Sequence, residues 1–325
     1  MYLLVCLNVL LDLFMGCSSG GAAVRDESGQ TKMVHFRTLD WGMPTLRRVL
    51  IQLDFKLHAD SEIVASSITY AGFTGVLTGV RKDLSLSLNF RGLHNDMDKW
   101  SSNVQYYGHH LMVLLGLRPS ISSVLRAYLL RPSPKSGKSA PSDLKDFQSY
   151  TEIVESASCR IQSLTTSACY LCFSSGEETT ILEKDRITAV SRSSGSFIVV
   201  TNADSEITDK DAVEAATPAP REQKAEAEIP GSFTASLAEI ISEANDRKQC
   251  AEHNYRNLLL EQRSQDSDLP TVDDIVEMVQ KYPTTNECTH FAAVMDPKEG
   301  RIAWSRYWMR PVGATWIRDH MSKGW

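Results

Sequence analysis

The segment from Leu84 to Phe90 constrains the fold more than any other stretch of this chain. Leucine and serine alternate along it, and it ends in Asn89 and Phe90. Because successive side chains of a strand point to opposite faces, the leucines and Phe90 share one face and Asn89 belongs to the other, polar face. The segment is therefore expected to be a half-buried β-strand whose polar face presents an asparagine to a functional site.

The remaining elements alternate between strands and helices along the chain. Period-two alternation predicts strands at 31–36, 48–57, 63–70, 168–173, 178–184, 196–201, 288–295 and 301–308. Helical spacing of apolar residues predicts helices within 106–130, broken near Arg118-Pro119, and at 144–162, 233–260 and 271–280. This order favours a layered α+β domain.

Composition limits the domain organisation. Of the 325 residues, 42% are hydrophobic, which is enough for the core of one large domain over residues 17–325. Two stretches are expected to be surface inserts: a Pro/Ser-rich segment at 131–143 and an acidic segment at 204–230 that has few large apolar residues. Neither insert is given a functional role.

Charge and side-chain chemistry exclude several classes of function. A net charge of −6 gives no reason to expect nucleic-acid binding, which needs a basic face, so a small molecule or lipid is the expected partner. The seven cysteines are odd in number and irregularly spaced, and the eight histidines show no metal-ligand spacing. No cofactor, metal or disulfide framework is expected.

One cysteine stands in a distinctive setting. Gly16-Cys17-Ser18-Ser19-Gly20 follows an apolar run, and the next predicted strand ends in Arg37-Thr38-Leu39-Asp40. This arrangement predicts a β-hairpin with a thiol at its start and an Arg-x-x-Asp pair at its end. A single cysteine is usually a small buried hydrophobe, so further motifs are needed to support a catalytic role.

Four further segments follow in a recognisable order. They are Gly72–Gly79 (GFTGVLTG), Leu88-Asn89-Phe90, Val200–Asp204 (VTNAD) and Asn286–Phe291 (NECTHF). With the cysteine hairpin, they resemble the choloylglycine hydrolase superfamily of N-terminal-nucleophile (Ntn) hydrolases, nearest to its acid ceramidase and acid amidase branch. Phe90 stands where that branch usually has Glu, and in this the chain is nearer to the bile-salt hydrolases.

The resemblance implies a fold and an activity. The fold would be the four-layer αββα sandwich of Ntn hydrolases. Residues 1–16 would be the end of an α-subunit that is cut off before Cys17 and stays a partner of the rest. The activity would be hydrolysis of fatty-acyl amides of the ceramide or N-acylethanolamine type, through a thioester on Cys17.

The resemblance also implies roles for individual residues. Asp40 would orient the α-amine of Cys17, and Arg37 would set the charge state of the thiol. Asn89, Asn202 and Asn286 would stabilise the oxyanion. Arg306 would be the last active-site arginine, with Arg310 as a competitor.

A cellular setting is implied less directly. Contact with membranes or lipid micelles would bring the enzyme to its substrate, and family members are often lysosomal or vacuolar. Residues 1–16 make a weak signal peptide, because no Lys or Arg precedes the apolar run and Asp12 interrupts it. The sequence itself leaves the compartment open.

Several alternatives stay open at this point. The chain could be an unprocessed or non-catalytic Ntn-fold binding protein, a bile-salt-hydrolase-like or penicillin-acylase-like amidase, or a lipoprotein acylated at Cys17. Arg37 and Asp40 could form a surface ion pair, and Asn202 and Asn286 could be turn residues.

Overall fold

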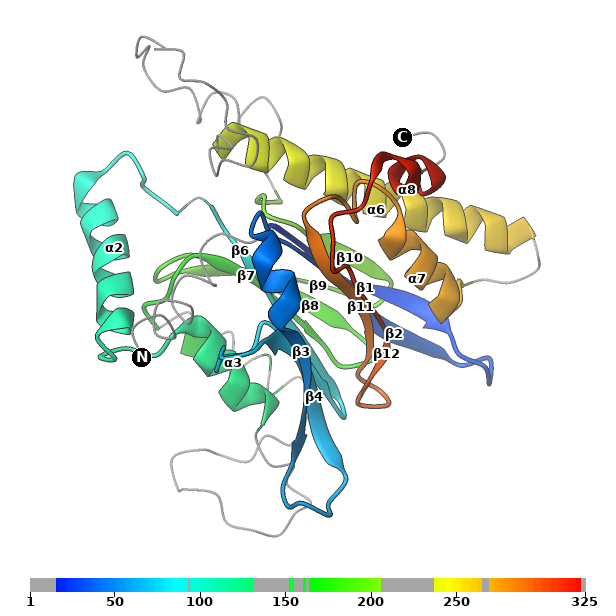
Figure 1. Ribbon diagram of the computed structural model, residues 1–325, viewed down its shortest axis with the longest axis horizontal. Coiled ribbons are helices and arrows are strands. Elements are labelled where there is room, and N and C mark those ends of the chain that lie inside the picture. The colour runs from blue at the N-terminus through cyan, green and yellow to red at the C-terminus, as the bar shows by residue number, and fades with distance from the viewer. Residues whose placement is uncertain are drawn as a thin grey trace.

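The chain folds into two antiparallel sheets with helices on their outer faces, as the computed structural model shows (Figure 1). The structure describes residues 16–92, 94–130, 152, 154, 160–161, 164–205, 237–264 and 269–322. The segment before Gly16, the insert at 131–143, nearly all of the insert at 204–230 and most of the helix expected at 144–162 lie outside the described residues.

The first sheet, sheet A, is built around the hairpin that begins with the cysteine. Its strand order is β10-β1-β2-β11-β12, with bounds β10 (Phe197–Val200), β1 (Gly16–Arg25), β2 (Thr31–Asp40), β11 (Thr289–Asp296) and β12 (Arg301–Tyr307). In the hairpin, Cys17 pairs with Leu39 and Gly16 pairs with Asp40. The expected strand at 31–36 thus continues to Asp40, which places both ends of the motif on paired strands.

The second sheet, sheet B, is a meander whose seven strands follow each other in chain order. They are β3 (Leu50–Lys56), β4 (Ile63–Tyr70), β5 (Thr78–Arg81), β6 (Leu84–Phe90), β7 (Cys169–Ser174), β8 (Thr179–Lys184) and β9 (Ala189–Ser194). The strand expected from residue 48 begins at Leu50. It is preceded by a 3₁₀-helix, η1 (Pro44–Val49), because Pro44 favours a helical first turn.

Strand β6 corrects one detail of the sequence-based expectation. Its leucines pack with helix α3 (Ile121–Leu129), but its polar face is buried too, with Ser85, Ser87 and Asn89 at most 1% exposed. That face lies against sheet A, where His35 contacts both serines. The alternation of leucine and serine in this strand therefore separates a face that packs against helix α3 from a face that packs against sheet A. Neither face is exposed to solvent.

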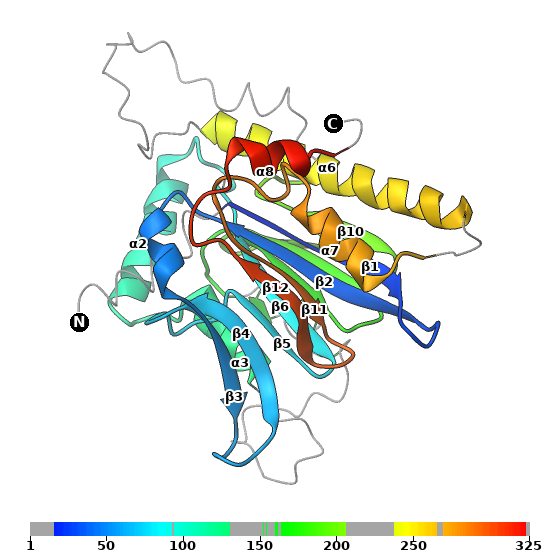
Figure 2. The same ribbon diagram turned by 45° about the vertical axis from the view of Figure 1, so that its right-hand side comes forward.

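The outer layers are helical (Figure 2). Helices α6 (Leu237–Ser264) and α7 (Val272–Gln280) cover the outer face of sheet A, where apolar residues such as Phe36 and Val294 pack against Ala251 and Ile275. Helix α3 covers sheet B, and α2 (Trp100–Leu114) and α8 (Ala314–Asp319) complete the described helices. The order helix, sheet, sheet, helix confirms the expected αββα sandwich.

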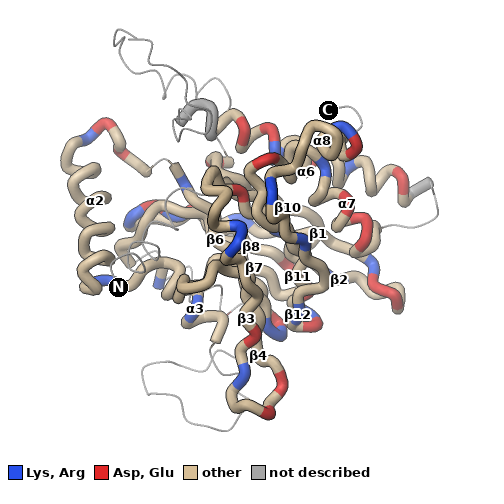
Figure 3. Tube along the Cα trace, viewed as in Figure 1, with Lys and Arg blue, Asp and Glu red and all other residues tan. Residues whose placement is uncertain are grey.

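Charged residues of both signs lie along the described part of the chain, and basic and acidic positions are interspersed along its trace (Figure 3). Within the described part of the chain, no helix is long and apolar enough to cross a membrane, and no group of three or more His, Cys, Asp and Glu side chains could hold a metal ion.

Candidate active site

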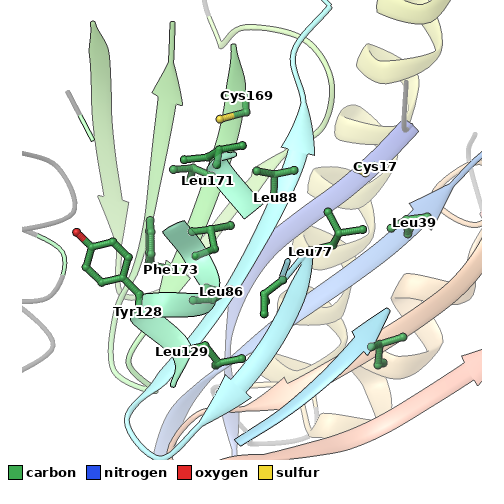
Figure 4. Close-up of a cluster of buried hydrophobic side chains, with 14 of the residues drawn as sticks. Cys17, Leu39, Leu77, Leu86, Leu88, Tyr128, Leu129, Cys169, Leu171 and Phe173 are labelled. Atoms are coloured by element: carbon green, nitrogen blue, oxygen red, sulfur yellow. The ribbon is translucent and has the colours of Figure 1, made fainter. Parts of the chain in front are cut away.

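The two faces of the β1–β2 hairpin give Cys17 two different environments. Residues 17, 19, 35, 37 and 39 face sheet B, and we call this the thiol side; Gly16 and Asp40 face helix α6, and we call this the amine side. Cys17 is fully buried, next to Leu39 on the neighbouring strand (Figure 4). The thiol of Cys17 therefore lies against sheet B, whereas its main-chain nitrogen belongs to the side of the hairpin that helix α6 covers.

On the thiol side, a buried arginine joins the two sheets. Arg37 donates through Nη1 to Ser19 Oγ at 2.8 Å and to Asn89 Oδ1, and through Nη2 to the Leu88 carbonyl at 2.8 Å. Ser19 Oγ donates to Asn89 Oδ1 at 2.7 Å. No ion pair joins Arg37 to a carboxylate among the residues described, so its positive charge is available to the thiol.

On the amine side, a buried ion pair holds the start of β1. Asp40 accepts from Arg247 Nη1 and from Thr289 Oγ1, both at 2.6 Å. Arg247 Nη2 donates at 2.8 Å to Asn202 Oδ1, and the same oxygen accepts the N–H of Cys17 at 2.7 Å. Asp40, Arg247 and Asn202 thus form a chain of polar contacts that ends at the Cys17 nitrogen.

Gly16, the residue before the cysteine, packs closely against Arg247 and Asp40. A Cβ added to Gly16 would lie 3.1 Å from Arg247 Nη1 and 3.2 Å from the Asp40 Cβ. Such distances are too close for an unstrained side chain, so glycine lets the Gly16–Cys17 peptide approach the ion pair.

The electrostatics of the two sides differ. Burial raises the pKa of the Cys17 thiol, Arg37 acts against this by stabilising the thiolate, and Asp40 reinforces it. Burial also raises the pKa of Asp40, while Arg247 and Thr289 act in the opposite direction by stabilising the carboxylate. The thiol is therefore protonated in the uncut chain, and a nucleophilic role would require a base.

The comparisons with known proteins bear on the fold. No model of a known protein family and no curated protein sequence matches the chain. The solved structure of a Caenorhabditis elegans N-acylethanolamine-hydrolyzing acid amidase ortholog is similar, with 20% identity, 90% of this chain and 100% of that chain covered, and a TM-score of 0.58. The chain therefore has the Ntn-hydrolase fold. A second similar structure, penicillin V acylase from Agrobacterium tumefaciens, has 12% identity, coverage of 90% and 84%, and a TM-score of 0.46.

Five of the residues singled out from the sequence come together in this fold. Cys17, Arg37, Asp40, Asn89 and Asn202 all belong to the hydrogen-bonded groups on the two sides of the hairpin. Arg37 and Asp40 do not form the surface ion pair that was an alternative, because each is buried and bonded to other residues. Their catalytic roles remain predictions.

The other two residues lie outside this group. Asn286 shapes its own loop, since its Oδ1 accepts from the Cys288 N–H at 2.8 Å. It contacts Thr289, which in turn contacts Asp40, through its main-chain N–H and carbonyl. Arg306 is exposed, donates to Gln280 Oε1 at 2.6 Å and lies over the Trp308 ring at 5.3 Å. The structure thus directs Arg306 toward α7 and away from Cys17.

A second arginine at the site is Arg247, to which the sequence analysis gave no role. It lies on α6 at helical spacing between the buried residues Ala244 and Ala251, and it is 4% exposed. A charged residue on the buried stripe of an amphipathic helix is a signal that could have identified it, because burying an arginine requires a specific partner. Thr289 belonged to a motif already noted but had no role assigned.

Proposed function

We propose that this chain is an amide hydrolase that cuts its own Gly16–Cys17 bond and then uses the new N-terminal Cys17 as its nucleophile. The observation that carries the proposal is the contact between the Cys17 nitrogen and Asn202 Oδ1, which Arg247 links to Asp40. This contact positions the nitrogen that would become the α-amine, while the thiol faces Arg37 on the other side. Nucleophile and base would then belong to one residue.

Self-cleavage would proceed through an acyl shift. Cys17 Sγ attacks the Gly16 carbonyl carbon, the C–S bond forms, the C–N bond breaks, and the departing nitrogen takes up the thiol proton. Water then hydrolyses the thioester, which leaves a carboxylate on Gly16 and a free α-amine and thiol on Cys17. Gly16 favours this step because it brings the peptide close to Arg247 without a side-chain clash.

Substrate hydrolysis would use the same atoms. The α-amine takes the proton from Sγ, the thiolate attacks the substrate carbonyl, and the amine half leaves with the proton that the α-amine returns. Water, deprotonated by the α-amine, then hydrolyses the acyl thioester. An α-amine has an ordinary pKa of about 7.7–8.0, which suits these transfers near neutral pH.

The Arg37 guanidinium would stabilise the negative charges of this reaction. In the uncut chain, Asn89 Nδ2 donates to the Val200 and Thr201 carbonyls, each at 3.1 Å, and Asn202 Nδ2 donates to the Phe90 carbonyl at 2.7 Å. Both N–H groups of the Asn89 amide are therefore occupied, and an oxyanion role for Asn89 requires a rearrangement on cleavage. Arg37 already lies close enough to lower the pKa of the thiol.

The substrate class we propose is the fatty-acyl amides, of the ceramide or N-acylethanolamine type. Two observations support it. Trp41, Phe73 and Leu77 belong to the same buried apolar cluster as Cys17, so the surroundings of the thiol are apolar, as an acyl chain requires. The similar solved structure from C. elegans is that of an N-acylethanolamine-hydrolyzing acid amidase ortholog.

The test begins with the intact mass and N-terminal sequence of the purified chain, expressed with the residues that precede Cys17. We expect a product that starts at Cys17 in the parent and not in Cys17→Ala. A Cys250→Ala variant is the matched control, because Cys250 is equally buried but lies on α6, where it contacts Tyr282 and Ser322. The cleaved parent and control should hydrolyse a fluorogenic fatty-acyl amide.

An uncut chain in every variant would contradict the enzyme proposal. It would favour the alternative of an unprocessed Ntn-fold binding protein, an alternative that the complete burial of Cys17 in the uncut chain also fits. Cleavage at Cys17 without amide hydrolysis would overturn only the substrate class.

A further inference from the structure

Three aromatic rings form a group on the thiol side, beside Cys17. Trp41 follows Leu39, the cross-strand partner of Cys17, by two residues, so its side chain shares the face of the thiol. The Tyr70 ring packs edge-on against Trp41 at 5.9 Å and against His290 at 5.9 Å between ring centroids. Trp41 and Tyr70 are 5% and 0% exposed, and both belong to the apolar cluster that contains Cys17.

The hydrogen bonds of His290 determine which atom of Tyr70 is available. His290 Nε2 lies 3.0 Å from the Trp41 carbonyl, which can only accept, so Nε2 carries the proton. Burial lowers the pKa of His290 to about 4, so the ring is neutral and its Nδ1 is an acceptor. Nδ1 lies 2.8 Å from Tyr70 Oη. The phenol therefore donates its proton to His290 and keeps its oxygen lone pairs for another group.

The group also contains a buried hydrogen-bond donor that has no partner in the described part of the chain. Trp41 Nε1 is buried and has no hydrogen-bond acceptor among the described residues. An unpaired buried donor costs on the order of 1–3 kcal/mol, so such atoms in a native fold call for an explanation. The ring group thus offers one donor, Trp41 Nε1–H, and one acceptor, Tyr70 Oη.

The Cys17 thiol is close to this group. After burial, Cys17 is the strongest of the influences that raise the pKa of Tyr70 well above its usual range. Cys17, Trp41 and Tyr70 also share one buried apolar cluster, so the thiol and the rings lie in the same part of the core.

The strand order indicates which half of a substrate would meet the rings. The leaving amine must take its proton from the Cys17 nitrogen, which is held by Asn202, just after β10 and on one side of β1. Trp41 follows β2 on the opposite side of β1, and His290 lies on β11 beyond it. Because the two halves of an amide leave the carbonyl carbon in different directions, the acyl half would extend toward the rings.

From this geometry we propose that the preferred substrates are amides whose acyl group carries a hydroxyl next to the scissile carbonyl, bound between Trp41 Nε1–H and Tyr70 Oη. The inference rests on the proposed amide hydrolysis and specifies its substrate. A hydroxyl both donates and accepts, so it satisfies both atoms at once. An unsubstituted alkyl chain would leave both unpaired, which is how a site discriminates against an analogue that lacks a polar group.

The experiment compares two amides of one acyl length on the same fluorogenic amine: a 2-hydroxyacyl amide and its unsubstituted counterpart. We expect the self-cleaved parent to prefer the hydroxylated amide by about tenfold or more in kcat/KM, the equivalent of one well-made hydrogen bond. Tyr70→Phe should reduce this ratio by about tenfold, and Trp41→Phe should act in the same direction. A second pair, the N-(2-hydroxyethyl) and N-ethyl amides of the unsubstituted acid, places the hydroxyl on the amine half.

Tyr255→Phe is the matched control. It also removes a buried phenol hydroxyl, but one that donates to the Ala23 carbonyl at 3.1 Å within the cluster that packs under α6 and α7. Its ratio should equal that of the parent. Melting temperatures and self-cleavage of all variants separate a specificity change from misfolding, and Tyr70→Phe carries the test alone if Trp41→Phe does not fold.

Three results would overturn the inference: equal rates for the two acyl amides, a ratio that Tyr70→Phe does not change, or a preference only for the hydroxyl on the amine half. In each of these, hydrolysis of the unsubstituted amide would leave the proposed function standing. A self-cleaved parent that hydrolyses none of the amides would overturn the proposed function and this inference with it.

Discussion

The thiol side and the amine side of one hairpin use buried arginines in opposite ways. Arg247 is paired with the carboxylate of Asp40, so the amine side combines both charges within 2.6 Å. Arg37 contacts neutral oxygens of Ser19, Leu88 and Asn89, so the thiol side keeps an uncompensated positive charge. The difference separates two tasks: a paired charge fixes the position of the Cys17 nitrogen, and an unpaired one favours the thiolate.

Removal of the acid on the amine side should have the largest effect on stability and self-cleavage. Asp40→Asn leaves the Arg247 charge buried without its partner, and loss of one member of a buried ion pair costs about 3–5 kcal/mol. We expect urea unfolding to show this decrease in the free energy of unfolding. We expect intact mass to show that the chain no longer cleaves itself. Asp296→Asn is the control, since it breaks the buried Lys32–Asp296 pair at the far end of the hairpin and should leave self-cleavage in place.

A second prediction compares Arg247 with Arg306. Arg247→Gln removes the group that links Asp40 to Asn202, so the rate of self-cleavage should fall by about a hundredfold. Arg306→Gln affects only contacts with Gln280 and Trp308, and the rate should change by less than about twofold. A larger loss for Arg306→Gln than for Arg247→Gln would support the catalytic role that the sequence analysis predicted for Arg306.

A third prediction concerns His35, which lies on the thiol side between Ser85 and Ser87. Burial, aided by Arg37, lowers its pKa from 6.5 to about 3, so the folded state disfavours the proton that the unfolded chain binds. His35 therefore supports folding above pH 6.5, and this support is lost as pH falls, by about 2 kcal/mol at pH 5. In urea unfolding at pH 7.5 and 5, His35→Gln should lose less stability than the parent; an equal loss would contradict the prediction.

A fourth prediction concerns the charge on the thiol side. Arg37 lowers the pKa of Cys17, so Arg37→Gln should shift the pH–rate profile of the mature enzyme to higher pH. A shift of one pKa unit reduces the thiolate fraction, and hence the rate at pH 7, about tenfold. Arg192→Gln, on β9, is the control, because Arg192 pairs with Glu183 and should leave the profile unchanged. A profile that does not move in Arg37→Gln would contradict the thiol-side role.

The smallest expected effect is at Gly16. Gly16→Ala forces Arg247 or Asp40 to shift by a few tenths of an ångström, a strain on the order of 1 kcal/mol, so self-cleavage should slow about five- to tenfold. Gly108→Ala meets no atom within 4 Å and serves as the control. Equal cleavage rates in the two variants would mean that the close approach of the ion pair does not matter.

Some elements of the fold could be predicted from the sequence, and others could not. The alternation from Leu84 to Phe90 correctly predicted a strand and the face of Asn89, and the layered fold is confirmed. The break near Arg118-Pro119 correctly predicted two helices, α2 and α3. The burial of Ser85 and Ser87 was missed because alternation within one strand does not reveal that a second sheet covers its polar face.

The residues of the candidate site can also be divided into those that the sequence predicts and those that it does not. The hairpin could be predicted from the sequence, since the spacing of Cys17 and Arg37-x-x-Asp40 and the period of a strand place these residues on paired strands and on defined faces. The contact between Asp40 and Arg247, 207 positions apart, and the contact of Arg306 with Gln280 of α7 could be learned from the three-dimensional fold alone. Local periodicity fixes the direction of a side chain within its element, whereas the element that it meets depends on the packing of the whole core.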